Sequence, residues 1–215
     1  MEEFVRARTE DQFNQRRDMI MKACDEIYER DGFLGVTFNN VSAKTSFTRP
    51  ALYNYYKNRE EMLLDLLKRE LLQWTEAVKE RFGTPVKMTK EEYCRNKVEL
   101  LSEHVKMCQL LSDLYLIERE CTPEDVAAVK KIAYEGNDFV CSCIRYVFPE
   151  ATDEEIASYQ DASIVQQFGT FRFTHMDQSH VDAYRHARPG RSPPDFKWML
   201  YNAEMCLMTM FEHRA

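Results

Sequence analysis

The sequence predicts an all-α fold. Its 215 residues include only 6 Gly and 7 Pro, which is fewer turn-forming residues than a sheet-rich fold with tight turns would need. Apolar residues recur at spacings of three, four and seven positions, which places them on one face of a helix. Several Thr or Asn residues are followed three positions later by Glu or Asp, a pattern typical of helix N-termini.

Three helices are predicted near the N-terminus. The first covers residues 12–31, where apolar side chains share one face, and Gly32 follows it as a natural stop. The second covers Thr37–Lys44 and the third Thr48–Tyr56, each with its threonine as N-cap. Pro50 falls in the first turn of the third helix, where a missing N–H does no harm.

A longer helix is predicted from about residue 59 to residue 82. Asn58 can cap it because Glu61 follows three residues later, and Gly83 breaks it. We therefore expect two domains. The first covers residues 1–58, and the second covers residues 59–215 and begins with the long connecting helix.

The rest of the chain repeats this helical pattern. Thr–Glu or Thr–Asp pairs three residues apart mark three helix starts, and the densest cluster of Pro and Gly marks a loop. We expect helices over residues 89–120, 122–147, 152–171 and 195–213, with a break near Cys108 in the first and a loop over 186–194.

The distribution of charge separates one segment from the rest. The formal net charge of −7 argues against a protein coated with nucleic acid. Residues 32–59, however, contain Lys44, Arg49, Lys57 and Arg59 and no Asp or Glu. A local excess of cations is typical of a surface that meets phosphates, although chance variation along a helical surface would give the same count.

Composition also limits location and chemistry. No segment approaches the roughly 18 apolar residues of a membrane span, and the acidic N-terminus is unlike a signal peptide. We therefore expect a cytoplasmic protein with no membrane partner and with reduced cysteines. The motifs Glu-x-x-His, Gly-x-Ser-x-Gly and Gly-Lys-Ser/Thr are absent. Their absence leads us to expect no catalytic residues and no cofactor. Cys141 and Cys143 would point about 200° apart on a helix, which is poor geometry for one ion, so we also expect no metal site.

The short second and third helices indicate a helix-turn-helix unit, because helices this short bury little apolar surface unless they pack on one another. In the third helix, Leu52 and Tyr56 share the face that should point inward. Residues Arg49–Pro50 and Tyr53–Asn54 cluster on the opposite side. Since Arg and Asn side chains fit guanine and adenine edges in the major groove, this face predicts a DNA reader.

Residues 48–63, TRPALYNYYKNREEML, resemble the recognition helix and following turn of the TetR family of transcriptional regulators. That family shows a small polar residue, then Leu-Tyr, an aromatic pair and a helix start similar to Lys-Glu-Glu-Leu. Residues 32–42 resemble the family's preceding Gly-aromatic, Thr and Ile-Ala segment. The chain departs from the family pattern at Ser42, Thr45, Ser46 and Arg59, which leaves the contact face intact.

The resemblance implies which residues touch DNA. It implies base contacts from Arg49, Pro50 and Asn54, and phosphate contacts from Thr37, Thr48, Tyr53, Tyr55, Lys57 and Arg59. We add Lys44 because of its charge. The alternative for Tyr53 and Tyr55 is that their rings only pack the three-helix core.

For the larger domain the resemblance implies a small-molecule effector and a homodimer, formed through the helices at 152–171 and 195–213. The last helix carries an apolar stripe of Phe196, Met199, Leu200, Ala203, Leu207, Met210 and Phe211, which would equally suit an intramolecular core. The candidates for an effector pocket are Trp74, Tyr115, Phe139, Cys143, Phe168, Phe171 and His175. Each would also suit an ordinary core.

These features favour a ligand-responsive transcriptional repressor that binds an inverted-repeat operator in double-stranded DNA as a homodimer. A dimer is also favoured physically, because one recognition helix reads only a few base pairs. The alternative is a helix-turn-helix protein whose C-terminal region is a protein-interaction module with no small-molecule effector. The sequence does not indicate which effector is bound.

Overall fold

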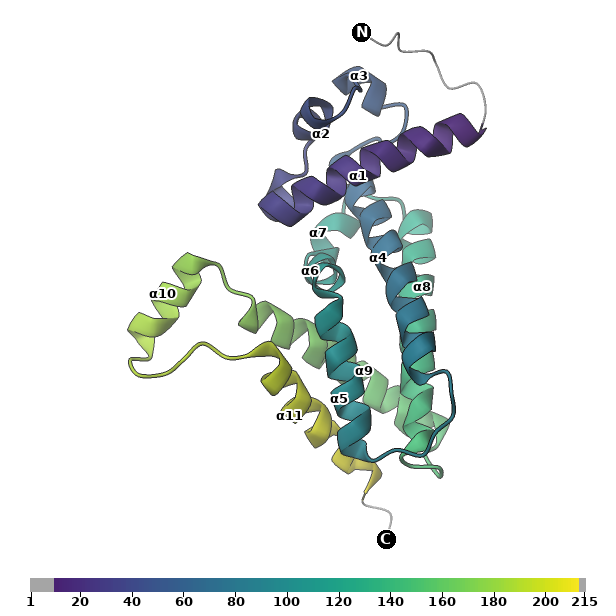
Figure 1. Cartoon of the computed structure of the whole chain (residues 1–215), viewed down its shortest axis with the longest axis vertical. Coiled ribbons are helices and arrows are strands. Elements are labelled where there is room, and N and C mark those ends of the chain that lie inside the picture. Colours follow the sequence, from purple (N-terminus) through teal and green to yellow (C-terminus); the bar gives the residue numbers. More distant parts are fainter. Residues whose placement is uncertain (1–9, 213–215) are drawn as a thin grey trace. The chain divides into compact units, whose positions relative to one another are not determined.

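The structure is a computed structural model that describes residues 10–212, and this part of the chain contains helices and no strand, which confirms the all-α prediction. It divides into two compact units (Figure 1). Of the described residues, the first unit contains those up to Arg69 together with Asp113–Ala127, and the second contains Glu70–Ser112 and residues 128–212. Two helices, α4 (Arg59–Phe82) and α8 (Pro123–Ser142), contribute residues to both units.

The first unit contains the predicted three-helix group. The unit consists of α1 (Glu10–Gly35), α2 (Phe38–Lys44), α3 (Arg49–Leu52), the start of α4, α7 (Leu114–Glu118) and the start of α8. Its fully buried side chains include Ile20, Ile27, Val41, Leu52 and Leu63. Tyr56 is also buried, so the predicted inward face of the third helix is confirmed.

Two helix ends in this unit differ from the prediction. Gly32 has a positive φ of 67° and interrupts α1 as expected, but helical structure resumes to Gly35. Helix α3 ends at Leu52, with a turn over 53–55. Asn54 and Tyr55 donate their N–H groups to the carbonyls three residues earlier, and such bonds tighten a helix end into a turn. Thr48 precedes α3 as predicted, but its side chain makes no capping hydrogen bond.

The long helix α4 has the predicted bounds. Asn58 Oδ1 accepts a hydrogen bond from Glu61 N at 2.8 Å. The Glu61 carboxylate accepts from Lys57 N at 2.7 Å, one residue earlier than a capping box requires. Asn58 Nδ2 donates to the carbonyl of Glu120 at 2.7 Å. This bond joins Glu120, in the segment 113–127, to the start of α4 within the first unit.

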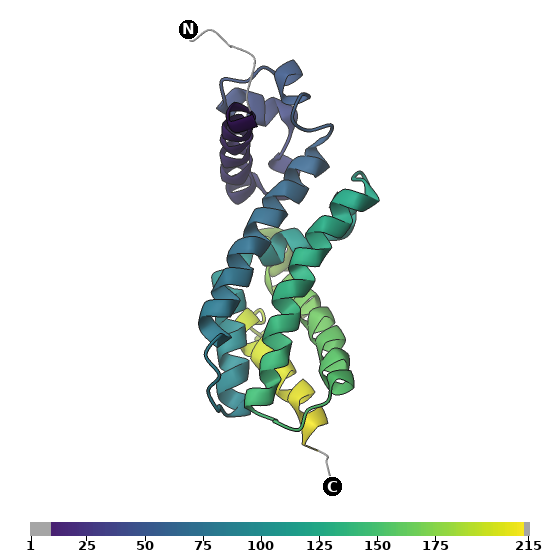
Figure 2. The same ribbon diagram turned by 90° about the vertical axis from the view of Figure 1, so that its right-hand side faces the viewer.

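The second unit is a bundle in which α11 packs against both α9 and α5 (Figures 1 and 2). Thr89 and Thr152 form the predicted capping boxes with Glu92 and Glu155. The unit's elements are the second part of α4, α5 (Lys90–Glu103), α6 (Val105–Ser112), most of α8, η1 (Cys143–Tyr146), α9 (Asp153–Thr174), α10 (Gln178–Ala187), α11 (Phe196–Met208) and η2 (Thr209–Phe211).

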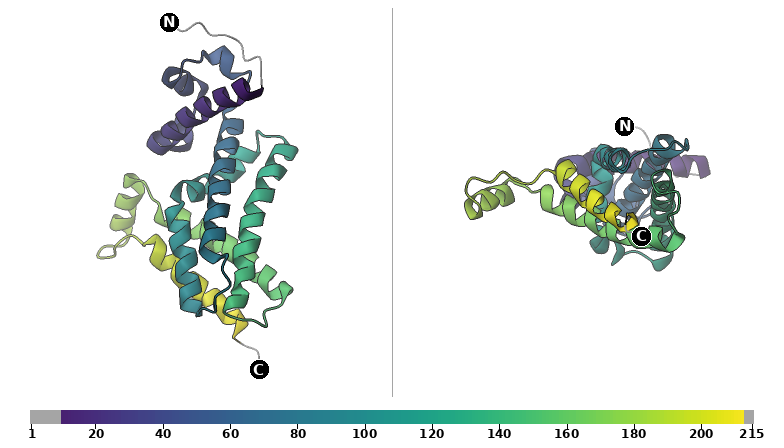
Figure 3. Two further views of the ribbon diagram at one scale, coloured as in Figure 1. Left: turned by 45° about the vertical axis from the view of Figure 1, so that its right-hand side comes forward. Right: turned by 90° about the horizontal axis from the view of Figure 1, so that it is seen from below.

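Two predictions for the bundle are wrong. The break expected near Cys108 falls instead at His104 and Asp113, so Cys108 lies inside α6. Helix α10 was not predicted. No residue of α10 is buried, and it extends away from α9 and α11 (Figure 3). Val181 and Tyr184 do recur at helical spacing and are half-buried, but a ten-residue segment with one such pair is too short a pattern to identify a helix.

The inward line of α11 also differs from the predicted stripe. The buried residues follow a spacing of four and are Phe196, Leu200, Glu204 and Met208. Met210 of the predicted stripe is exposed, and the expected end at His213 lies outside the described residues. A glutamate therefore occupies a position where the sequence predicted only apolar contacts.

Glu204 belongs to a buried polar cluster that links α5, α9 and α11. Lys97 Nζ donates to Tyr159 OH at 3.0 Å, Ser163 Oγ at 2.6 Å and Glu204 Oε2 at 3.2 Å. Tyr159 and Ser163 also donate to the Glu204 carboxylate. Since an ammonium has three protons, every donor of Lys97 has a partner. The cluster is therefore a fully hydrogen-bonded part of the bundle core.

Within residues 10–212, no helix is long and apolar enough to cross a membrane.

Candidate nucleic-acid interface

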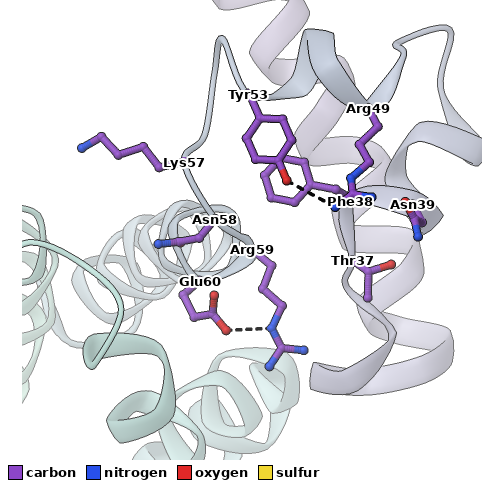
Figure 4. Close-up of a pocket in the computed structure, with 9 residues that line it drawn as sticks. All are labelled: Thr37, Phe38, Asn39, Arg49, Tyr53, Lys57, Asn58, Arg59 and Glu60. Atoms are coloured by element: carbon purple, nitrogen blue, oxygen red, sulfur yellow. Dashed lines mark hydrogen bonds and ion pairs between the residues drawn. The ribbon is translucent and has the colours of Figure 1, made fainter.

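An open pocket of about 350 Å³ lies on the first unit, between the start of α2, α3 and the first turn of α4 (Figure 4). We call it the basic pocket. Its lining residues are Thr37, Phe38, Asn39, Arg49, Tyr53, Lys57, Asn58, Arg59 and Glu60. Five of the ten predicted DNA-contact residues are among them, and the chain brings these together from three separate elements.

The pocket carries three cations and one carboxylate. The side chain of Lys57 is 77% exposed, with its Nζ 3.6 Å from Glu61. Arg59 Nε donates to Glu60 Oε1 at 2.7 Å, and the Arg59 guanidinium lies 4.7 Å from the ring centre of Phe33. Arg59 is therefore held in place, whereas Lys57 is free to reach a phosphate because exposed ion pairs are weak.

Tyr53 forms one wall of the basic pocket. Its ring stacks on Phe38 with ring centres 4.5 Å apart, yet 49% of the residue is exposed. Arg49 NH2 donates to Tyr53 OH at 3.5 Å. The ring of Tyr53 can therefore pack on Phe38 and still leave the hydroxyl free to contact a phosphate, because only one ring face is covered and the hydroxyl lies at the surface beside Arg49.

Tyr55 is placed differently. Its ring stacks on Phe13 of α1 with centres 4.8 Å apart and meets the edge of Phe47 at 5.9 Å. The residue is half-buried and does not line the basic pocket. These contacts support the packing alternative for its ring, and a phosphate contact from its hydroxyl stays a prediction.

Thr37 and its neighbours fix the start of α2. Thr37 Oγ1 accepts from Asn40 N at 3.1 Å, and Asn40 Nδ2 donates to Gly35 O at 2.8 Å. Asn39, which the sequence analysis did not select, is exposed at the pocket edge. The sequence signal for Asn39 was its position two residues after the predicted cap Thr37, in the first turn of α2.

The remaining predicted contacts lie outside the pocket. Thr48, Pro50 and Asn54 are exposed around α3, and Asn54 Nδ2 donates to Ala51 O at 3.2 Å. Lys44, at the opposite end of α2 from Thr37, is paired with Glu26 of α1 at 2.6 Å. The structure therefore does not bring Lys44 together with the other cations.

A buried network supports the turn that follows α3. Tyr56 OH donates to Asp65 Oδ2 of α4 at 2.6 Å and accepts from Arg17 Nε of α1 at 3.1 Å. Arg17 also pairs directly with Asp65 at 3.1 Å. Burial and the adjacent Asp65 carboxylate raise the pKa of Tyr56 above its ordinary value, so the hydroxyl keeps its proton. Sequence analysis missed Arg17 and Asp65 because they lie on separate helices.

A family model supplies the decisive comparison. Residues 68–209, more than half of the chain, match the model described as "Tetracyclin repressor-like, C-terminal domain". The chain belongs to the TetR family. The match lies C-terminal to the residues that carried the resemblance in sequence, so the two observations are independent.

Solved structures share the fold of this TetR-family chain. FadR of Thermus thermophilus, a TetR-family repressor in complex with lauroyl-CoA, aligns over 90% of this chain and 93% of its own with 18% identity and a TM-score of 0.58. A transcriptional regulator structure from Saccharomonospora viridis in complex with choline aligns over 94% and 97% with 13% identity and a TM-score of 0.56. A search among curated proteins found no match.

The predicted effector residues of this regulator differ in exposure and in the unit to which they belong. Tyr115 is 73% exposed and belongs to the first unit. His175 is exposed and stacks on Phe171 at the end of α9, with ring centres 3.9 Å apart. Trp74 is buried in α4. Cys143 is buried in η1, while Phe139 and Phe168 are half-buried.

The thiols differ sharply in burial. Burial raises the pKa of Cys24, Cys94 and Cys108 to about 12, so few thiolates form at neutral pH. Burial also raises the pKa of Cys143. Cys206 on α11 is exposed. Within residues 10–212 no group of three or more His, Cys, Asp or Glu residues is positioned to hold a metal ion.

Proposed function

We propose that this TetR-family transcriptional regulator is a ligand-responsive repressor that binds an inverted-repeat operator as a homodimer. The observation that carries the DNA-binding part is the exposed face of α3 beside the basic pocket. There Arg49 and Tyr53 lie next to Lys57 and Arg59 on a unit built as a helix-turn-helix. The charge distribution agrees with this surface, because the chain has a net charge of −7 whereas residues 32–59 contain four cations and no Asp or Glu.

In this proposal α3 enters the major groove. Arg49 and Asn54 would read base edges, because their paired donors and acceptors match guanine and adenine. Lys57, Arg59 and the Thr37 hydroxyl would hold phosphates on the flank and set the register of the helix. Tyr53 would donate its hydroxyl to a phosphate from its stacked position on Phe38.

The dimer part is supported by apolar surface on the predicted helices. Val165 and Phe173 of α9 are 70% and 49% exposed, and Trp198 of α11 is 67% exposed. Helix α10, between them in sequence, has no buried residue, although a ten-residue helix is marginal in water on its own. A second copy covering this region would remove both features from water.

The effector part is supported by the structural neighbours. FadR of Thermus thermophilus was solved with lauroyl-CoA and the Saccharomonospora viridis protein with choline. At 18% and 13% identity, these structures support a shared fold and do not identify the ligand of this chain. For this chain we therefore propose a small-molecule effector in the second unit.

Selection of bound sequences from a random duplex library tests the DNA-binding proposal. We expect the protein to enrich an inverted repeat whose half-sites are spaced by about one helical turn or a multiple of it. Arg49→Ala should change the enriched half-site, while Lys131→Ala, an exposed cation of α8 far along the chain from the helix-turn-helix, should leave it unchanged. No enrichment at low and moderate salt would overturn the proposal.

A further inference from the structure

We propose that Glu60 limits the affinity of this regulator for DNA by offsetting the positive charge of Arg59 in the basic pocket. The inference rests on the proposed DNA-binding surface and adds an acidic residue to it. Glu60 acts through Arg59, so it is a positioning residue and not a DNA contact itself. Its effect falls on all duplexes alike, because phosphate contacts carry no sequence information.

Glu60 supplies the carboxylate of the basic pocket. Only 9% of the residue is exposed, and its Oε1 accepts a hydrogen bond from Arg59 Nε at 2.7 Å (Figure 4). A glutamate is rarely buried to this degree unless it is paired. Since the side chain of Arg59 is only 31% exposed, water and salt screen this pair less than a pair on the open surface. Glu60 therefore holds Arg59 by charge as well as by the hydrogen bond.

Phe33 provides a second contact for the same guanidinium. Its ring centre lies 4.7 Å from Arg59 Cζ, within the distance of about 6 Å over which an aromatic face attracts a cation. A guanidinium has five N–H donors, and the bond to Glu60 uses Nε alone. The NH1 and NH2 groups of Arg59 therefore remain to donate to a phosphate while the guanidinium stays beside Glu60.

A purely structural role for Glu60 would be to stabilise α4, because an acid in the first turn of a helix interacts favourably with the helix dipole. Glu61 already occupies that turn and accepts a hydrogen bond from Lys57 N at 2.7 Å. The carboxylate of Glu60 instead binds the side chain of a cation that lines the basic pocket. This choice of partner favours an effect on DNA binding over an effect on the helix alone.

The electrostatic consequence follows from how proteins bind DNA. Each phosphate that a Lys or Arg neutralises releases condensed counterions, and this release supplies most of the nonspecific affinity. Arg59 and Glu60 together carry no net charge, so Arg59 donates hydrogen bonds to a phosphate but adds little counterion release. Replacing Glu60 by an uncharged residue leaves a net positive charge at the same place. The buried carboxylate thus keeps the affinity for DNA below the value that the cations alone would give.

Fluorescence anisotropy of Glu60→Gln tests this role, with the wild-type chain as the reference. Glutamine keeps an oxygen that accepts from Arg59 Nε and removes the charge. We expect Glu60→Gln to bind both the selected operator and a scrambled duplex more tightly, by about fivefold or more at about 0.1 M salt. The dependence of log K on log salt should steepen by about 0.9 for each bound copy of the chain. A residue that only stabilises α4 would not change this slope.

Three further variants complete the test. Glu60→Asp keeps the charge and should leave the salt slope unchanged. Glu124→Gln removes the same charge from an exposed glutamate of α8 in the first unit, and it should leave both affinity and slope unchanged. Glu60→Ala removes the charge together with the hydrogen bond and should show the steeper slope, so the test does not depend on the folding of Glu60→Gln alone. Thermal unfolding followed by circular dichroism checks that each variant is folded.

If Glu60→Gln binds DNA no more tightly than the wild type, Glu60 only stabilises α4 and the inference is wrong. A gain of the same size in Glu124→Gln would also overturn it, because the overall charge of the unit would then set the affinity. Tighter binding with an unchanged salt slope would exclude the charge of Glu60 as the cause. A wild-type chain that binds no duplex at low salt overturns the DNA-binding proposal itself, whereas the other results overturn only the role of Glu60.

Discussion

At the scale of single residues, the first unit exposes two kinds of side chain that we propose for DNA binding. Arg49 on α3 and Asn54 in the turn that follows it are both exposed, and we propose that they read base edges. Lys57 sits after the turn with its side chain 77% exposed. Base readers and phosphate holders affect binding differently: the first set sequence preference, while the second set affinity for any DNA.

We expect Asn54→Ala to relax sequence choice at one position of each half-site, at a cost of about 1–3 kcal/mol for each base that the side chain reads. Lys57→Ala should weaken all duplexes alike and lower the dependence of log K on log salt by about 0.9 for each phosphate that the lysine neutralises. Fluorescence anisotropy with the selected operator and a scrambled duplex at several salt concentrations measures both. An Asn54→Ala protein with unchanged sequence preference would mean that the reading face is assigned incorrectly.

Tyr56 stabilises the first unit through its hydrogen bonds to Asp65 and Arg17. Replacing it by Phe removes the hydroxyl shared by Asp65 and Arg17, and a hydrogen bond to a charged group contributes about 1.5–3 kcal/mol. We expect Tyr56→Phe to lower the free energy of unfolding of the first unit by that amount at pH 7.5. Since the folded-state pKa of Tyr56 is raised, this stabilisation is complete below pH 10 and is lost as pH rises further. Tyr134→Phe, at a residue 53% exposed, is the control.

At the scale of elements, helix starts were predictable and helix ends were less so. Thr89 and Thr152 cap their helices as expected, because a capping box needs only residues three apart in sequence. The end of α3 depends on Asn54 bonding to the carbonyl of Ala51, which competes with helix continuation. Helix α10 escaped prediction because its ten residues carry few apolar side chains and its cap, Asp177, is not followed by an acidic residue three positions later.

The buried Lys97–Glu204 pair shows a second limit of sequence reasoning. Glu204 occupies a line of apolar residues along α11, and only the fold reveals that Lys97 of α5 lies opposite it. The hydrogen-bond partners of Glu204 lie 41 to 107 residues away from it in sequence. In the basic pocket, by contrast, most residues come from one segment of the chain, so local sequence patterns could identify them.

We expect Lys97→Met to lower the free energy of unfolding of the bundle by about 3–5 kcal/mol, because it leaves a buried carboxylate without its cation. Adding Glu204→Leu should recover most of that stability, since an apolar pair of similar volume is often neutral or stabilising. Urea unfolding followed by circular dichroism measures both. Arg145→Ala, which breaks an exposed pair with Asp153, should scarcely matter. A double variant no more stable than Lys97→Met would show that the cluster stabilises through more than charge pairing.

At the scale of the whole molecule, the proposed operator binding requires two chains acting together. A single α3 reaches few bases, and a twofold pair of heads multiplies discrimination. The apolar side chains that α9 and α11 expose can be altered without touching the folded core. Trp198, for example, is 67% exposed, so a polar substitution there should act on association and leave folding intact.

We therefore expect Trp198→Asp to shift the protein from dimer towards monomer, because a carboxylate in a closed apolar interface is desolvated without a partner. Operator binding should then fall and become steeper in protein concentration, because assembly now accompanies binding. Sedimentation velocity and anisotropy titrations measure the two effects. Tyr115→Asp, at a residue 73% exposed in the first unit, should leave the dimer unchanged. If Trp198→Asp stays dimeric at low micromolar concentration, the interface lies on another face of the bundle, and the exposed apolar side chains of α9 and α11 need a different partner.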